Sequence, residues 1–142
     1  MKAVSGITCL TLTLASCVSV QGTKPIHVDV LKQTTSSWDG SALPKYPTKQ
    51  PEVTILRITI APGARLPWHK HPIINAGVLL YGKLTILAEN HESLHLNAGD
   101  PFVEEVNKWH YGINESTETA EVIVFYAGEP GEPLSIPRDS DH

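Results

Sequence analysis

Short runs of alternating hydrophobic and polar residues, separated by turn residues, make up most of the chain. Residues 53–60 alternate as a half-buried strand does, and a Pro62-Gly63 turn follows them. Residues 78–87 repeat the pattern, with a break at Tyr81-Gly82 where we expect a hairpin bend or bulge. Because no helical pattern exceeds a turn or two, we predict an all-β sandwich or barrel of short strands.

Residues 121–127 form a nearly continuous hydrophobic run. Six of these seven residues are apolar, and most of them are β-branched or aromatic. Such a run is typical of a strand that is buried on both faces. We therefore predict that this strand lies inside the fold.

The N-terminal third is more polar. Residues 26–30 alternate and predict a first strand, and a turn-rich arm with Trp38 and Tyr46 follows. We interpret the two aromatic residues as anchors that hold the arm on the barrel; the alternative, that they close the mouth of a cavity, is open. The chain thus divides into a leader (residues 1–22), a strand and arm (23–51), a packed barrel (52–128) and a proline-rich, acidic tail (129–142).

The leader has the pattern of an export signal. Lys2 precedes a mostly apolar stretch at residues 3–14, which is too short to span a bilayer but suits a signal peptide. Residues 14–17, ending at Cys17, resemble a bacterial lipobox, which implies cleavage before Cys17 and lipidation of that residue. Ordinary cleavage near Gly22 is the alternative. We expect an exported protein, either free in the periplasm or an envelope lipoprotein, in the outer membrane if the cell is Gram-negative.

Composition narrows the range of partners. The 142 residues suit one domain, and a net charge of -4 without a basic stripe argues against binding to nucleic acid. Both cysteines, Cys9 and Cys17, lie in the leader, so the folded domain has no disulfide and no thiolate metal site. A chain of this charge would contact a membrane only through a lipid anchor.

Three histidines form a candidate metal site. His69 and His71 are two residues apart, so on a strand both imidazoles point to the same side. His110 lies near the start of a later turn-to-strand segment and could supply a third nitrogen. Three neutral imidazoles suit one divalent ion of iron, manganese, zinc, nickel or copper, which the sequence does not distinguish.

The spacing around these histidines resembles the cupin superfamily. The first cupin motif matches at Gly63, His69, His71, Asn75 and Gly82, and the second matches at Gly99, His110 and Asn114. The usual proline and glycine in the turn at residues 105–107 are absent. The chain resembles small bacterial single-domain cupins, which implies a double-stranded β-helix, or jelly-roll barrel, and pairing into a homodimer through the sheets.

Asn75 is a departure from the pattern. The resemblance implies a glutamate there, and a neutral asparagine leaves more positive charge on the ion and offers a weaker ligand. Asn75 is therefore only a candidate fourth ligand. Glu104 or Glu105 could supply the missing carboxylate from the strand before His110, but the sequence does not fix where either points.

Other residues near the motifs are candidates for the wall of a pocket. Tyr81, Phe102 and Tyr111 could line it or could be ordinary core residues. Arg65 shares strand parity with His69 and could meet an anionic ligand, or it could lie in solvent on the barrel rim.

Residues 91–95 match the H-E-x-x-H signature of zinc proteases, which requires a helix. Turn residues on either side favour a hairpin, and a strand would separate His91 from His95 by about 13 Å. We therefore keep the protease only as a remote alternative.

Two functions remain open from the sequence. The chain could be a mononuclear metal enzyme, such as an iron-type dioxygenase of a small organic molecule, but no residue identifies itself as catalytic. Alternatively, it could be a binding cupin at the cell envelope that holds a metal or a small ligand without turnover.

Overall fold

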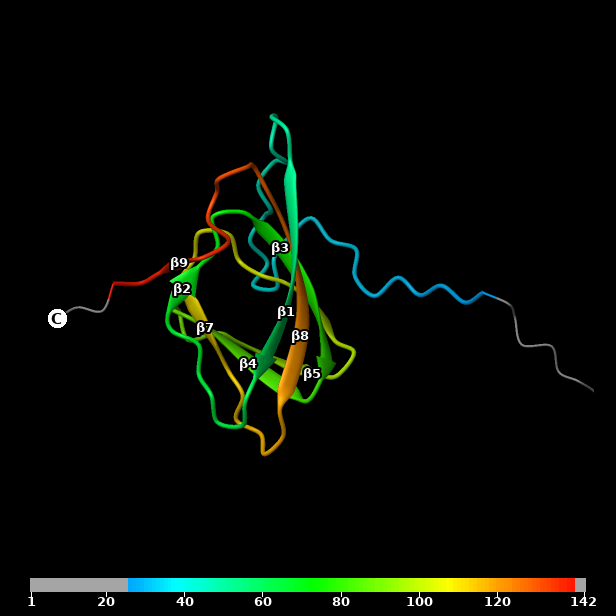
Figure 1. The fold of residues 1–142 in the computed structure, drawn as a ribbon, viewed down its shortest axis with the longest axis vertical. Coiled ribbons are helices and arrows are strands. Elements are labelled where there is room, and N and C mark those ends of the chain that lie inside the picture. Colours follow the sequence, from blue (N-terminus) through cyan, green and yellow to red (C-terminus); the bar gives the residue numbers. More distant parts are fainter. Residues whose placement is uncertain (1–25, 140–142) are drawn as a thin grey trace, which may run out of the picture.

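The computed structural model describes residues 26–139, and the strands in this part form two antiparallel sheets (Figure 1). No helix occurs among these residues. The first sheet has the order β1-β8-β3-β6 and the second has the order β5-β4-β7-β2-β9. The strands are β1 (Glu52–Ile60), β2 (His69–Lys70), β3 (Ile74–Tyr81), β4 (Lys83–Ala88), β5 (Ser93–Asn97), β6 (Pro101–Val103), β7 (His110–Ile113), β8 (Ala120–Gly128) and β9 (Ile136–Pro137). The predicted all-β fold is confirmed.

The core lies between the inner faces of the two sheets. On β8, Val122 and Val124 point inward and are almost fully buried, and Leu79 of β3 is completely buried beside them. Ile86 of β4 meets these residues from the opposite sheet. Burying such side chains stabilises the fold by about 1.5–3 kcal/mol each, so this layer holds the two sheets together.

The expected hairpin bend separates β3 from β4 at Gly82. Its φ of +77° is in the left-handed region, and a Cβ there would lie 2.5 Å from the backbone oxygen of Thr119. Only glycine meets both conditions. The turn before β7, where the usual glycine is absent, instead uses Asn107 at a φ of +60°, a conformation that asparagine tolerates better than most residues.

Two expectations about the ends of the fold are wrong. Residues 26–30 form no strand: they are extended and exposed, because no neighbouring strand pairs with them. The packed region also continues past Gly128, since β9 in the tail pairs with β2. The tail is therefore part of the second sheet.

The expected leader and Cys17 lie outside the described residues. Among the residues that are described, none belongs to a helix with the length and hydrophobicity needed to cross a bilayer.

Candidate metal centre

The second sheet brings the three predicted histidines together. His69 on β2 is directly paired with His110 on β7, and His71 follows β2, where it bridges to Val106. Their ring centroids are 4.7 to 5.2 Å apart, and one ring nitrogen from each lies within 4.8 Å of the others. The three side chains could therefore hold one metal ion, as predicted.

Each imidazole is oriented through its other nitrogen. The Nδ1 atoms of His69, His71 and His110 lie 2.8, 2.6 and 3.2 Å from the backbone oxygens of residues 67, 134 and 108, respectively. A carbonyl only accepts, so each Nδ1 donates a hydrogen and the lone pair of a neutral ring resides on Nε2. Metal-binding histidines are held in this way, because the second nitrogen fixes the tautomer and the ring direction.

The Nε2 of His110 gives a further indication of a metal. It is buried and has no hydrogen-bond partner among the described residues. A buried nitrogen without a partner costs about 1–3 kcal/mol, and coordination of an ion would satisfy it. The residues present thus fit a metal.

Glu104 supplies a carboxylate beside the histidines. Its Oε2 lies 3.0 Å from Nε2 of His71, and its Oε1 lies 3.6 Å from Nε2 of His110. Burial raises the pKa of Glu104, but the hydrogen bond and charge of His71 outweigh burial, and the net pKa is lowered. An ionised carboxylate therefore lies beside two of the three imidazoles. The sequence left the direction of this side chain open.

The contact between Glu104 and His71 gives the three histidines pKa shifts in different directions. Burial lowers the pKa of His69, and it lowers that of His110 to about 4. Burial also acts on His71, but the hydrogen bond to Glu104 and its negative charge raise the pKa of this ring. Two imidazoles are thus held neutral, as ligation requires. The third shares a proton with Glu104, which a divalent ion would replace.

Asn75 and Glu105 are also fully buried nearby. Neither amide atom of Asn75 has a hydrogen-bond partner in the described part of the chain. Glu105 accepts a hydrogen bond from Nε1 of Trp38 at 2.7 Å, and burial raises its pKa to about 6. Trp38 therefore anchors the arm, as interpreted from the sequence, whereas Tyr46 is 77% exposed and does not.

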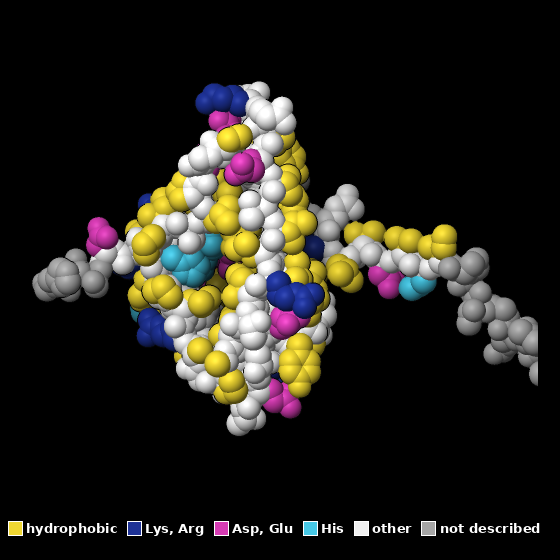
Figure 2. Space-filling view, viewed as in Figure 1, with side chains coloured by type: hydrophobic (Ala, Val, Ile, Leu, Met, Phe, Trp, Pro, Cys, Tyr) yellow, Lys and Arg dark blue, Asp and Glu magenta, His cyan; other side chains and the backbone are white. Residues whose placement is uncertain are grey.

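A cavity of about 50 Å³ opens beside the histidines. His69, His71 and Glu104 form its polar wall, and its other lining residues are Ile58, Ile60, Leu66, Leu84, Ile86, Phe102, Gly112, Val122, Val124 and Tyr126. Apart from the histidines, no basic side chain lines it. Figure 2 shows histidine surface on the body of the barrel, bordered by hydrophobic side chains.

The candidate pocket residues separate into two groups. Phe102 lines the cavity, whereas Tyr81 is 53% exposed and bonds to Glu118. Arg65 stacks on the ring of Tyr111, 3.7 Å from its centroid, so neither of them is part of the cavity lining. The sequence did not single out Tyr126, which is 4% exposed and has its ring 5.5 Å from that of His71. Strand alternation could have identified Tyr126, because it lies on the same face of β8 as Val122 and Val124.

Residues 91–95 do not form the helix that a zinc protease needs. His91 lies in the turn after β4 with a φ of +69°, and His95 lies on β5, where its Nδ1 is 3.1 Å from Oγ1 of Thr85. The predicted hairpin is confirmed, and the protease alternative falls.

A family model for the cupin domain matches residues 56–126, which is half of the chain. The chain belongs to the cupin family. This confirms the resemblance of its two motifs and the jelly-roll fold. No curated protein sequence matches the chain.

Solved structures share this fold. An oxalate oxidase in complex with the substrate analogue glycolate is 25% identical, with a TM-score of 0.50, and the match covers 58% of this chain but only 45% of that one. A protein with a double-stranded β-helix domain from Klebsiella pneumoniae subsp. pneumoniae MGH 78578 is 16% identical, with a TM-score of 0.52, over 68% and 90% of the two chains. The DMSP lyase DddQ from Ruegeria pomeroyi DSS-3 is 17% identical, with a TM-score of 0.54, over 63% and 45%. The last two support the fold alone.

Proposed function

We propose that this cupin binds one divalent metal ion through Nε2 of His69, His71 and His110, with the carboxylate of Glu104 as the fourth ligand. The observation that supports it most is the hydrogen bond from each Nδ1 to a backbone carbonyl, which leaves three Nε2 atoms facing one point. Glu104 restores the negative charge that Asn75 does not provide. Three nitrogens and one oxygen suit iron or manganese, although zinc, nickel and copper also accept imidazole.

Within this proposal, the protein is an oxygen-dependent enzyme that acts on a small organic acid. The ion would supply open positions for substrate and oxygen and would polarise the bound acid. The likeness to an oxalate oxidase in complex with glycolate supports this substrate class. The cavity of about 50 Å³ supports a ligand of only a few heavy atoms.

The residues of the chain have separate tasks in this reaction. The backbone carbonyls of residues 67, 108 and 134 orient the imidazoles, and the apolar wall excludes water. The phenol of Tyr126 keeps its proton, because burial raises its pKa, and can donate a hydrogen bond to a bound carboxylate. Because the cavity lining has no lysine or arginine, the ion itself would neutralise the acid.

One observation favours a second function. A cavity this small leaves little room for both a substrate and oxygen, which suits a protein that binds a metal or a small anion without turnover.

Elemental analysis of the purified chain, followed by oxygen uptake with oxalate, glycolate and catechol, tests both functions. We expect one metal ion per chain, and oxygen uptake with an acid that is lost in His110→Ala. Stoichiometric metal without uptake would support the binding function instead. Absence of metal after reconstitution with iron, manganese and zinc would contradict both.

Export and lipidation are a further part of the proposal. They rest on the leader at residues 1–22 and on Cys17. Metabolic labelling with a radioactive fatty acid should mark the protein, and Cys17→Ser should abolish the label. An unlabelled protein recovered from the periplasm would support ordinary cleavage near Gly22.

A further inference from the structure

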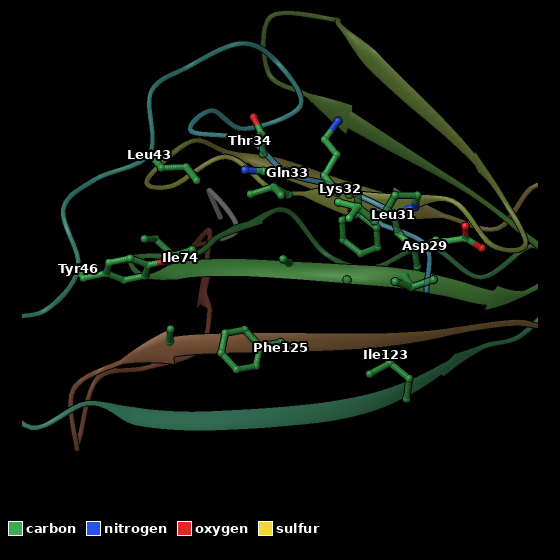
Figure 3. A pocket seen from close by; sticks show the side chains of 18 residues that line it. Asp29, Leu31, Lys32, Gln33, Thr34, Leu43, Tyr46, Ile74, Ile123 and Phe125 are labelled. Carbon is green, nitrogen blue, oxygen red and sulfur yellow. The ribbon is translucent and has the colours of Figure 1, made fainter. Parts of the chain in front are cut away.

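The outer faces of the two sheets differ in chemistry. The outer face of the first sheet is mostly hydrophobic: Ile74, Ile123 and Phe125 line a groove of about 690 Å³ there, together with part of the N-terminal segment (Figure 3). The outer face of the second sheet instead carries aromatic rings and basic side chains. It lies on the side of that sheet away from the histidine rings, so it is separate from the metal centre.

Strand alternation places three aromatic rings on this second face. His69 on β2 and His110 on β7 point inward, so the residues next to them in sequence point outward. These neighbours include Trp68, Trp109 and Tyr111, which are only partly buried. The rings of Trp68 and Tyr111 meet edge to face, with their centroids 4.7 Å apart. Two adjacent strands thus supply an exposed aromatic surface.

A basic side chain lies over each of these rings. Three such contacts occur: Arg65 on Tyr111, Lys70 on Trp109, and Arg138 near both Trp68 and Trp109. The cation-to-centroid distances are 3.7, 4.9, 5.9 and 5.5 Å, in that order. A guanidinium stacked on a ring still presents the N–H groups of its edge to a carboxylate. The rings therefore hold basic groups in position before a ligand arrives.

The charge on these groups is largely uncompensated. Arg65 and Lys70 form no ion pair with a carboxylate among the described residues. Arg138 pairs with Glu89 at 2.8 Å, but the two side chains are 45% and 54% exposed. An ion pair this exposed contributes little in water, so an incoming carboxylate can take the place of Glu89. The face is thus cationic in a chain whose net charge is -4.

The basic groups are spread along the sheet. Arg65 is bridged to Ile113 at one end of β7, whereas Lys70 lies over Trp109, just before the other end. Residues 109–113 span about 13 Å along an extended strand. One small anion cannot reach both groups. A ligand that contacts them together must carry several negative charges along its length.

We propose that the outer face of the second sheet binds an acidic oligosaccharide. Its carboxylates pair with Arg65, Lys70 and Arg138, and its sugar rings pack on the aromatic surface between them. The C–H groups of a pyranose ring are apolar and match the surface of indole and phenol rings, whereas its charged groups match the cations. The alternation of rings and cations on the protein thus resembles the alternation of sugar rings and carboxylates in the ligand.

A hollow beside Trp109 suits the hydroxyl groups of the same ligand. It has a volume of about 410 Å³, and Asn90 and Asn107 are among its lining residues. Oδ1 of Asn90 accepts a hydrogen bond from the amide of Glu92, which leaves the Nδ2 group of Asn90 free to donate. Amide side chains offer both donors and acceptors, as sugar hydroxyls require.

The same observations argue against other polyanions. Binding of single-stranded nucleic acid relies on bases that stack on open ring faces, but here a cation lies over a face of each ring. The net charge of -4 disfavours both a phosphate backbone and an anionic membrane surface. A carboxylated saccharide needs only the local charge of this face.

An NMR titration of the isotope-labelled, zinc-reconstituted chain with tetragalacturonate tests the proposal. The chain has three tryptophans, so three indole N–H signals report on binding. We expect the signals of Trp68 and Trp109 to shift. Trp38 is the internal control, because its Nε1 is bonded to Glu105, and its signal should not move. Galacturonate monomer and the neutral maltotetraose should bind at least tenfold more weakly than tetragalacturonate.

Substitutions on the face should change the dissociation constant in opposite directions. Arg65→Gln and Arg138→Gln should each raise it about threefold or more, and together about tenfold or more. Glu89→Gln should lower it, because a competing carboxylate is removed from Arg138. Arg57→Gln, on the outer face of the first sheet, is the matched control and should have no effect. Far-UV circular dichroism and metal content should stay unchanged in all four variants.

Several outcomes would overturn the proposal. One is the absence of a shift at Trp68 and Trp109, and another is a tetragalacturonate affinity that Arg65→Gln and Arg57→Gln change equally. Equal binding of maltotetraose would remove the role of charge, and equal binding of the monomer would remove the role of spacing. Tighter binding of single-stranded DNA or of anionic vesicles would assign the face to another partner. Because metal content is measured separately, failure here is distinct from failure of the proposed function.

Discussion

The loop after β6 presents the same chemical group to two very different surroundings. Glu104 faces the histidines, and the hydrogen bond and positive charge of His71 outweigh burial and lower its pKa. Glu105, the next residue, accepts a hydrogen bond from Nε1 of Trp38 through Oε2, which also lies 3.7 Å from Nδ1 of His110. Burial raises its pKa to about 6, and its Oε1 has no hydrogen-bond partner among the described residues. Adjacent carboxylates thus have opposite tendencies, and side-chain direction decides which of them can serve a metal.

The largest effect on metal affinity should come from removing an imidazole that lies beside Glu104. We expect His110→Ala to lower metal affinity by roughly a hundredfold or more, since losing only an orienting partner costs about 10- to 100-fold. Competition with a chromogenic chelator measures the change. His95→Ala on β5 is the matched control and should retain the metal; equal losses in the two variants would argue against a localised site.

The two carboxylates themselves give the next test. Glu104→Gln should lower metal affinity by about tenfold or more, because an amide is a weaker, neutral ligand. Glu105→Gln should leave the affinity nearly unchanged, because its Oε2 accepts from Trp38 and, at 3.7 Å from Nδ1 of His110, is beyond hydrogen-bond distance of that ring. The same chelator competition compares them. Equal effects of the two substitutions would contradict the assignment of Glu104, rather than Glu105, to the metal.

A substitution at Glu105 should increase stability when the free energy of unfolding is measured without metal. In wild type, Glu105 has a folded pKa of about 6 against an ordinary value of 4.5, so above pH 6 its ionisation opposes folding. Glu105→Gln should then raise the free energy of unfolding by up to about 2 kcal/mol. The gain should shrink as pH falls through 6 and disappear below 4.5, where the group becomes protonated in both states. Urea unfolding at several pH values measures it, and a gain independent of pH would contradict the assignment.

The smallest effect should come from the partner of Glu105. Trp38→Phe keeps the ring but removes the Nε1 donor, so we expect a loss of about 1 kcal/mol in unfolding free energy. Metal affinity should stay close to that of wild type. A large loss of metal would mean that Trp38 acts on the site rather than only on Glu105.

The sequence predicted those parts of the molecule that depend on local pattern. Alternation located β1 and the β3–β4 hairpin, and motif spacing identified His69, His71 and His110. Alternation failed at residues 26–30, because a strand also needs a neighbour, which periodicity does not reveal. The direction of Glu104 was not predictable, since it lies in an irregular loop with no period.

The contacts made by the C-terminal tail could not be predicted from the sequence either. The carbonyl of Leu134 orients His71, yet a backbone oxygen has no signature in the sequence. The pairing of β9 with β2, which brings it there, involves only two residues. Such a short element gives no periodic signal.

The N-terminal segment is fastened directly to the loop that bears Glu104. Oγ of Ser37 donates to the backbone oxygen of Glu104 at 2.9 Å, and the amide of Trp38 is bonded to Val103 next to it. A shift of Ser37 or Trp38 would therefore displace the backbone of this loop directly. The position of the carboxylate beside the imidazoles thus depends on how residues 37 and 38 are held.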